Sequence, residues 1–386
     1  MKRSLLLSAL FLAACASGSD KSQQTGSTPP AANPYSMESK TIPVGVIPAA
    51  VLHDSQRNKD LEMSIEYPTH EGPYPVVIFS PGYGSSRSDY VGLSAYWASH
   101  GYVVIKPSHA DAGTLRETTR ERVEEQRPQG RERRQRPTAQ PQQPAVFRPD
   151  PAEMWQTQKP EDWRNRVADI TFIIDSLPKL VEQYPEIKER VDANRIGVGG
   201  HSYGAFTALL IGGLRASNVS PADPRVKAIE AMSPPGPSSD RGLTNESWAN
   251  LRIPTLFLTG SRDFGATESE DVAWRKQGYE LSPPGDKWFV SIAGAGHSSF
   301  TGRLGEPLFA PNQPAPYPTN RPPIGGAYPQ QQPMRTQPGA APFLGQTTTV
   351  RTISLAFWDA YLKNDSAGRE YLNKLKIRGD VQVDSK

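Results

Sequence analysis

The feature that most constrains the fold is a series of short apolar runs without polar alternation. PYPVVIFS is one of them, and such a run is typical of a strand buried on both faces. The other runs of this kind are YVVIKPS, RIGVGGHS, VKAIEAMSP, PTLFLTG and KWFVSIAG. Helical patterns separate most of them. This alternation predicts the α/β class, with a mostly parallel sheet and helices on both of its faces.

Further elements are expected on either side of this series. TIPVGVIPAAVL and LEMSIEYPT predict two opening strands. DYVGLSAYWASHG predicts a helix that ends at Gly101, because glycine is a common helix stop. WRNRVADITFIIDSLPKLVEQY predicts one long amphipathic helix, and SLAFWDAYLKND is expected to close the chain as a helix. No internal repeat is visible.

The first residues read as an export signal rather than as part of the fold. Two basic residues precede a short apolar run in residues 1–14, which is typical of a secretory signal peptide. The run Leu12-Ala13-Ala14-Cys15 resembles the lipobox of bacterial lipoproteins, which implies lipidation of Cys15, the chain's one cysteine. An ordinary signal peptide that contains a cysteine is the alternative. We expect an exported, membrane-anchored lipoprotein, in the periplasm or at the cell surface, with a flexible tether over residues 15–40.

One domain is expected over residues 41–386, interrupted by two low-complexity insertions. Residues 114–150 are rich in Arg, Glu, Gln and Pro, and residues 303–345 in Pro, Gly and Gln; neither composition can build a core. The Arg-rich insertion is either a solvated segment or a patch for an anionic surface. A formal net charge of +3 is too small to suggest a nucleic-acid partner. Both insertions follow predicted strands, at the carboxyl edge where parallel sheets carry their sites.

The stretch Gly200-His201-Ser202-Tyr203-Gly204 is a G-x-S-x-G pentapeptide between a predicted strand and a predicted helix. In a nucleophile elbow the serine occupies a strained strand-to-helix turn, and flanking glycines let strand and helix approach closely. The new helix directs its N–H groups at a developing anion. Ser202 is therefore the predicted nucleophile.

A serine hydroxyl needs a base, and the base needs an orienting acid. In this type of fold the order along the chain is serine, acid, histidine. Asp263 follows the strand PTLFLTG, and His297 follows KWFVSIAG, so they are the predicted acid and base. Rivals for these two roles, from the same chain, are His109 as base, and Glu230 or Asp240 as acid. His201 adjoins the nucleophile but is expected to point away from it.

Acyl transfer also needs two donors for the oxyanion. The N–H of Tyr203 is one candidate. The other is the N–H of Tyr83, in the Pro81-Gly82-Tyr83-Gly84 loop after the first buried strand. Gly82 and His109 are candidates for lining the pocket. A simple glycine turn is the alternative interpretation of this loop.

At these residues the chain resembles a known superfamily. The segments PVVIFSPGYGSSRSDYVGLSAYWASHGYVVIKP, RVADITFIIDSL, RIGVGGHSYGAF, PTLFLTGSRD, GAGHSSF and FWDAYLKND resemble α/β-hydrolases near bacterial platelet-activating-factor acetylhydrolases, predicted dienelactone hydrolases and polyester-cutting cutinases. Two positions depart from these relatives. Dienelactone hydrolases use a cysteine where this chain has Ser202, and many acetylhydrolases have a histidine where it has Pro81. The resemblance implies an α/β-hydrolase fold and a triad.

The predicted function is hydrolysis of a carboxylic ester by a Ser-His-Asp triad through an acyl-enzyme. The substrate is expected to be a small-molecule, lipid or polyester ester, with the membrane reached through Cys15. No metal and no cofactor are implied, because no HExxH, cysteine cluster or nucleotide-binding glycine pattern occurs. A serine peptidase on the same fold and an inert surface binding protein are the alternatives.

Overall fold

In the computed structural model the described residues are 35, 41–113, 160–265, 269–301 and 341–386. They all belong to one unit, which runs from Pro34 to Lys386. The predicted signal peptide (1–14), Cys15, most of the tether (15–40), the insertion 114–150 and most of the insertion 303–345 lie outside the described residues. No helix within these described ranges has both the length and the apolar character needed to cross a membrane.

The described part of the chain forms a nine-stranded sheet in the order β1-β2-β4-β3-β5-β6-β7-β8-β9. Strands β3 to β8 pair in parallel, while β1, β2 and β9 pair antiparallel at the two edges. The strands are β1 Val44–Asp54, β2 Lys59–Pro68, β3 Tyr74–Ser80, β4 Val103–Pro107, β5 Val191–His201, β6 Val226–Met232, β7 Thr255–Arg262, β8 Lys287–Gly296 and β9 Val381–Ser385. The predicted α/β class and the mostly parallel sheet are confirmed.

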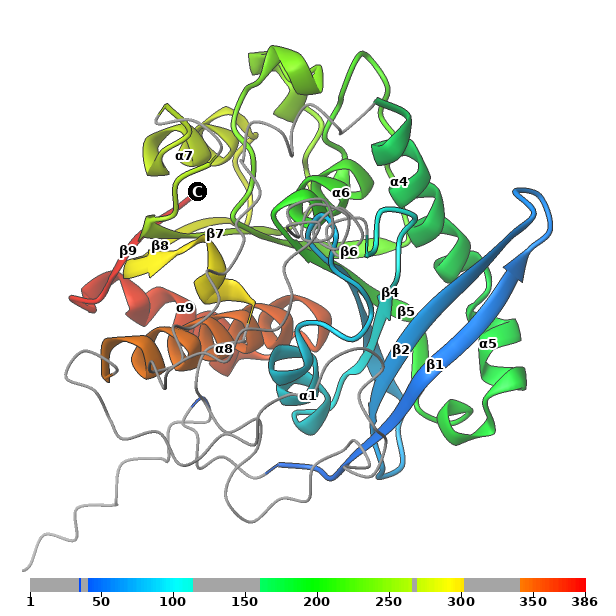
Figure 1. Cartoon of the computed structure of the whole chain (residues 1–386). Helices are drawn as coiled ribbons and strands as arrows, with labels where there is room; N and C mark the ends of the chain where they lie inside the picture. The colour runs from blue at the N-terminus through cyan, green and yellow to red at the C-terminus, as the bar shows by residue number, and fades with distance from the viewer. Residues whose placement is uncertain (1–34, 36–40, 114–159, 266–268, 302–340) are drawn as a thin grey trace, which may run out of the picture. The chain divides into compact units, whose positions relative to one another are not determined.

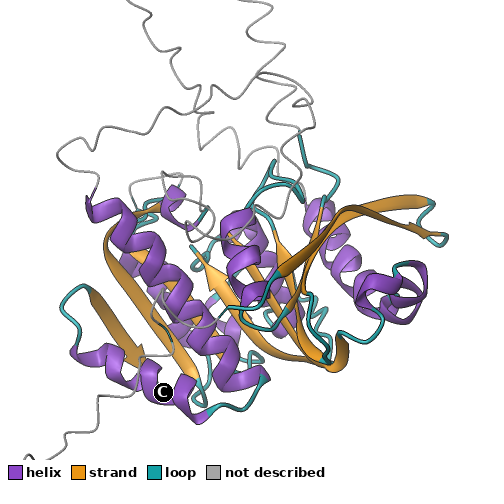
Figure 2. Cartoon of the chain, turned by 90° about the horizontal axis from the view of Figure 1, so that it is seen from below, coloured by secondary structure: helices purple, strands orange, loops and turns teal. Residues whose placement is uncertain are grey.

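Helices cover both faces of this sheet (Figure 1). On one face α4, α5, α6 and α7 share a core cluster with the strands, and on the other face α1, α8 and α9 share a second cluster. Figure 2 shows the long helix α8 lying over the strands. The helices are α1 Val91–Ser99, α4 Pro160–Asp175, α5 Leu177–Gln183, α6 Tyr203–Gly212, α7 Val272–Leu281, α8 Ala341–Leu362 and α9 Ser366–Lys374.

The continuous apolar runs follow from these two cores. On β3, Val76 and Ile78 belong to the first cluster, whereas Val77 and Phe79 belong to the second. Successive side chains of a strand point to opposite faces, so each face of β3 needs apolar residues and no polar alternation survives. Burial on both faces is the reason that these runs predicted the central strands correctly.

The expected single helix over residues 163–184 is wrong in one respect, because the structure divides it into α4 and α5. The break falls at Ser176, which precedes Leu177 and Pro178. Proline has no backbone N–H and its ring clashes with the carbonyl four residues earlier. A proline in the first turn of α5 is tolerated, whereas the same proline inside a continuous helix is not.

The end of the chain also differs from the expectation. Helix α8 does not close the chain, since α9 and the edge strand β9 follow it. Helix α8 begins at Ala341, so the last five positions of the predicted insertion 303–345 are helical. In the predicted tether, Tyr35 is 3% exposed and its ring lies 4.6 Å from that of Tyr371. An aromatic side chain buried in this way adds apolar contact to the second core cluster.

Candidate active site

Ser202 lies on the turn between β5 and α6, with a backbone φ of 57° and ψ of −117°. A positive φ is uncommon for a residue with a side chain, and such conformations gather at functional sites. Neighbouring structure holds the turn in place, because the Ser202 N–H donates to the Met232 carbonyl at 2.9 Å and the Ser202 carbonyl accepts from Phe206 N–H at 3.1 Å. The backbone geometry is that of a nucleophile elbow.

The glycines on either side of Ser202 are required by close backbone approach. A Cβ at Gly200 would collide with the Gly204 carbonyl, and a Cβ at Gly204 would collide with the Ser80 carbonyl at the end of β3. The elbow therefore packs directly on the strand that leads into the predicted oxyanion loop. This packing explains in physical terms why the sequence places glycine two residues before and two residues after the serine.

Asp263 and His297 meet at the carboxyl ends of β7 and β8. His297 Nδ1 lies 2.9 Å from Asp263 Oδ1, and Thr259 Oγ1 donates to Asp263 Oδ2 at 2.8 Å. Asp263 is fully buried, while the His297 side chain is 40% exposed. A buried carboxylate that bonds Nδ1 leaves the other ring nitrogen available for proton transfer.

Arg275 keeps this carboxylate charged. Its Nη2 lies 3.1 Å from Asp263 Oδ1, and its Nε donates to the Asp263 backbone carbonyl at 3.0 Å. Burial by itself raises the pKa of Asp263, but Arg275 and the bond to His297 outweigh it and hold that pKa below its ordinary value. Sequence analysis missed Arg275. Its signal is a charged residue on the buried side of α7, one turn from Tyr279.

His201 lies between the turn at Ser202 and the ring of His297. Its ring centroid lies 4.6 Å from that of His297, and its Nδ1 lies 2.8 Å from the Tyr90 hydroxyl. Burial, and next to it the charge of His297, lowers the pKa of His201 well below its usual range, so this imidazole is neutral. The sequence predicts that His201 points away from the serine; the structure shows that its ring packs against the His297 ring.

The two predicted oxyanion residues lie together. Tyr203 is the first residue of α6, and its ring lies 6.0 Å from the Tyr83 ring in an edge-on arrangement. Gly82, between β3 and Tyr83, donates its N–H to the Tyr90 hydroxyl at 3.1 Å. The backbone N–H of Tyr203 belongs to the first turn of α6, where the helix dipole favours a negative charge.

The rival site residues occupy other places. His109 is 3% exposed, with Nε2 3.0 Å from Ser80 Oγ and Nδ1 2.9 Å from Asp169 Oδ2. It therefore lies behind the loop that follows β3, not on an open pocket wall. Glu230 is fully buried and accepts a bond from Ser354 in α8 at 2.7 Å. The structure joins His297 to Asp263 and gives no bond between His297 and these rivals.

The third rival, Asp240, lies in the short 3-10 helix Ser239–Arg241 after β6. Its carboxylate oxygen Oδ1 lies 3.4 Å from Ser239 Oγ. Among these candidate acids, Asp263 is the one that the described structure bonds to His297.

Within the described ranges, no group of three or more His, Cys, Asp or Glu side chains is arranged to hold a metal ion.

The chain is similar in sequence to known proteins. Residues 50–301, more than half of the 386-residue chain, match the family described as platelet-activating factor acetylhydrolase, isoform II. Cutinase est2 of Thermobifida alba is 24% identical over 61% of this chain and 56% of its own length. Cutinase 2 of Thermobifida cellulosilytica is 23% identical over 65% of this chain and 66% of its own length. The chain thus spans about half the length of the first of these relatives.

The matched segment contains all the parts of the site described above, from the loop after β3 to His297. The predicted resemblance to these acetylhydrolases and cutinases is confirmed. With its α/β sheet and its serine elbow inside the matched residues, the chain belongs to the platelet-activating factor acetylhydrolase isoform II family.

Proposed function

We propose that this protein is a serine carboxylic-ester hydrolase in which Ser202 is the nucleophile, His297 the general base and Asp263 the orienting acid. One observation carries the proposal. Ser202 occupies a strained elbow with φ of 57°, and its neighbour His201 packs against His297, whose Nδ1 is bonded to the buried Asp263. The family match and the names of the relatives support ester hydrolysis as the reaction.

The first half of the reaction forms an acyl-enzyme. Ser202 Oγ attacks the ester carbonyl carbon while His297 Nε2 accepts the hydroxyl proton. The backbone N–H groups of Tyr83 and Tyr203 donate to the oxyanion of the tetrahedral intermediate. The intermediate collapses, the bond between the carbonyl carbon and the alcohol oxygen breaks, and His297 returns its proton to the departing alcohol.

The second half releases the acid. A water molecule attacks the acyl carbon as His297 Nε2 takes its proton, and the carbonyl bond to Ser202 Oγ breaks as that proton returns to the serine. Asp263 remains a carboxylate throughout and holds the Nδ1–H tautomer of His297. The buried cation Arg275 supports that state, since it lowers the pKa of Asp263.

The substrate class is an acyl ester of a small alcohol, a lipid or a polyester. An assay with nitrophenyl esters graded by acyl length, beside an aminoacyl anilide, tests this choice. Turnover of the esters without turnover of the anilide is the expected result. Faster cleavage of the anilide would identify a peptidase, and no turnover of either would identify a binding protein.

We also propose that the protein is exported and attached to a membrane through lipidated Cys15, where it contributes to lipid degradation. The basic start, the apolar run and the Leu12–Cys15 segment support this placement. Cys15→Ser should move the protein from the membrane fraction to the soluble fraction without changing its activity on a soluble ester. Retention of the variant in the membrane fraction would contradict lipidation at Cys15.

A further inference from the structure

Arg166 reaches from α4 into the loop that follows β3, which we call the oxyanion loop (residues 81–84). Its Nη1 donates to the Pro81 carbonyl at 2.8 Å, and its Nη2 donates to the Gly82 carbonyl at 3.2 Å. Arg166 is only 1% exposed. A buried guanidinium with its planar set of donors fixes the direction of the groups that it binds, so two successive carbonyls of this loop have defined orientations.

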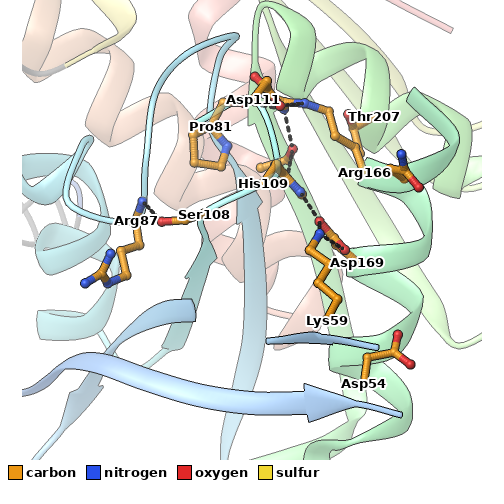
Figure 3. Close-up of polar contacts among 12 residues, drawn as sticks. Asp54, Lys59, Pro81, Arg87, Ser108, His109, Asp111, Arg166, Asp169 and Thr207 are labelled. Atoms are coloured by element: carbon orange, nitrogen blue, oxygen red, sulfur yellow. Dashed lines mark hydrogen bonds and ion pairs between the residues drawn. The ribbon is translucent and has the colours of Figure 1, made fainter. Parts of the chain in front are cut away.

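Asp111 locks the guanidinium from the other side (Figure 3). Arg166 Nε and Nη2 donate to the two Asp111 oxygens at 2.9 and 2.6 Å, and Asp111 Oδ2 also accepts the Gly84 N–H at 2.9 Å. Burial raises the pKa of Asp111, but Arg166 outweighs this and lowers it. The ionised pair therefore bonds the oxyanion loop at both of its ends.

A second buried network anchors the residue that enters the loop. Ser80 Oγ lies 3.0 Å from His109 Nε2, and His109 Nδ1 lies 2.9 Å from Asp169 Oδ2, which Lys59 also bonds at 2.8 Å. Figure 3 shows His109 between the loop and α4. Burial, with the nearby charge of Arg166, lowers the pKa of His109. This Ser-His-Asp arrangement is buried, and its hydrogen bonds join the end of β3 to α4.

The anchors determine where the next N–H points. Gly82 is held at both of its peptide groups, since its N–H donates to Tyr90 and its carbonyl accepts from Arg166. The carbonyl and the N–H of a trans peptide point in opposite directions. With the Gly82 carbonyl held toward Arg166, the Tyr83 N–H of the same peptide is directed to the opposite side, away from the guanidinium.

The same guanidinium also contacts the second donor residue, because Arg166 Cζ lies 4.5 Å from the centre of the Tyr203 ring. We propose that Arg166, locked by Asp111, is a positioning residue. It directs the Tyr83 N–H at the oxyanion and holds Tyr83 in a fixed position relative to Tyr203. This inference rests on the proposed ester hydrolysis. It predicts that Arg166 acts on the transition state without touching the substrate.

Arg166→Lys keeps the charge and removes the fork of donors. We expect kcat on a soluble nitrophenyl ester to fall by roughly 10²-fold, with KM nearly unchanged, because a displaced oxyanion donor weakens only the transition state. The rate of fluorophosphonate labelling should fall in parallel. Arg225→Lys is the matched control, because Arg225 pairs with Asp223 and Asp175 beside the amino end of β6, far along the strand from the elbow.

A purely structural role would lower the melting temperature of Arg166→Lys while kcat of the folded enzyme stayed at the wild-type value, and that result would overturn the inference. Asp111→Asn decides the matter if Arg166→Lys does not fold. It removes the negative charge that locks the guanidinium, so kcat should fall with KM nearly unchanged, and a kcat unchanged from wild type would again contradict the inference. A wild-type chain without esterase activity would instead refute the proposed function itself.

Discussion

His297 Nδ1 lies 2.9 Å from Asp263 Oδ1, although 34 residues separate the two in the chain. Both follow the carboxyl ends of adjacent parallel strands, β7 and β8. Parallel strands place their carboxyl ends at the same edge of the sheet, where open α/β sheets carry their sites. The pairing is thus a consequence of topology, and the buried Arg275 adds the charge that keeps the acid ionised.

Asp263→Asn tests this pairing. We expect kcat to fall by roughly 10⁴-fold, because an amide favours the wrong tautomer of His297. Steady-state kinetics with a soluble ester, and a thermal melt to establish folding, measure the effect. Asp240→Asn is the control and should keep wild-type activity. If Asp240→Asn lost activity while Asp263→Asn retained it, Asp263 would not be the acid that orients His297.

Gly204→Ala tests the close packing of the elbow on β3. The added methyl group collides with the Ser80 carbonyl, and overpacking of this kind costs about 1–3 kcal/mol of unfolding free energy. Denaturant unfolding should show this loss together with reduced esterase activity. Gly345→Ala in α8 is the matched control, since no atom of the described residues lies within 4 Å of its added Cβ. Equal stability of the two variants would contradict the packing described here.

Glu230→Gln tests a buried acid that the mechanism does not use. Burial raises the pKa of Glu230 to about 8 from an ordinary 4.5. Between these two pH values the folded protein retains a proton that the unfolded chain releases. The contribution of Glu230 to the free energy of unfolding is therefore fully present below pH 4.5 and declines as the pH rises toward about 8.

The variant should remove that decline. Between about pH 5 and about pH 8 its unfolding free energy should fall less than that of the wild type, by a few kcal/mol. Denaturant unfolding at a series of pH values measures it. Glu182→Gln, at an exposed position of α5, should follow the wild-type curve. A Glu230→Gln curve parallel to the wild type would show that Glu230 is ionised in the folded protein.

Much of the fold was predictable from local sequence. Each apolar run marked a central strand because burial on both faces leaves no room for polar alternation. The edge strand β9 and helix α9 were missed, since an edge strand is only partly covered and VQVDS is neither long nor strongly apolar. The division of α4 from α5 could have been predicted from Pro178, because a proline has no backbone N–H and cannot continue the hydrogen bonding of a helix.

Some residues of the candidate site were predictable from local sequence, and others were not. Ser202, Asp263 and His297 were predicted because glycines and strand ends mark them locally. Arg166 was missed because its partners Pro81 and Asp111 lie 85 and 55 residues away along the chain. Its signal was a charged residue on the apolar side of a helix: Trp163, Val167, Ile170 and Ile173 are all buried beside it. A cation at such a position needs a buried partner.

The central claim is that Ser202 is the nucleophile of an esterase, and covalent labelling tests it most directly. A fluorophosphonate probe should inactivate the wild-type protein with one label per chain, and mass spectrometry of the digest should find that label on the peptide that contains Ser202. Ser202→Ala should remain folded, take up no label and lose roughly 10⁶-fold in kcat. A label on any other residue, or esterase activity that survives in folded Ser202→Ala, would contradict the account.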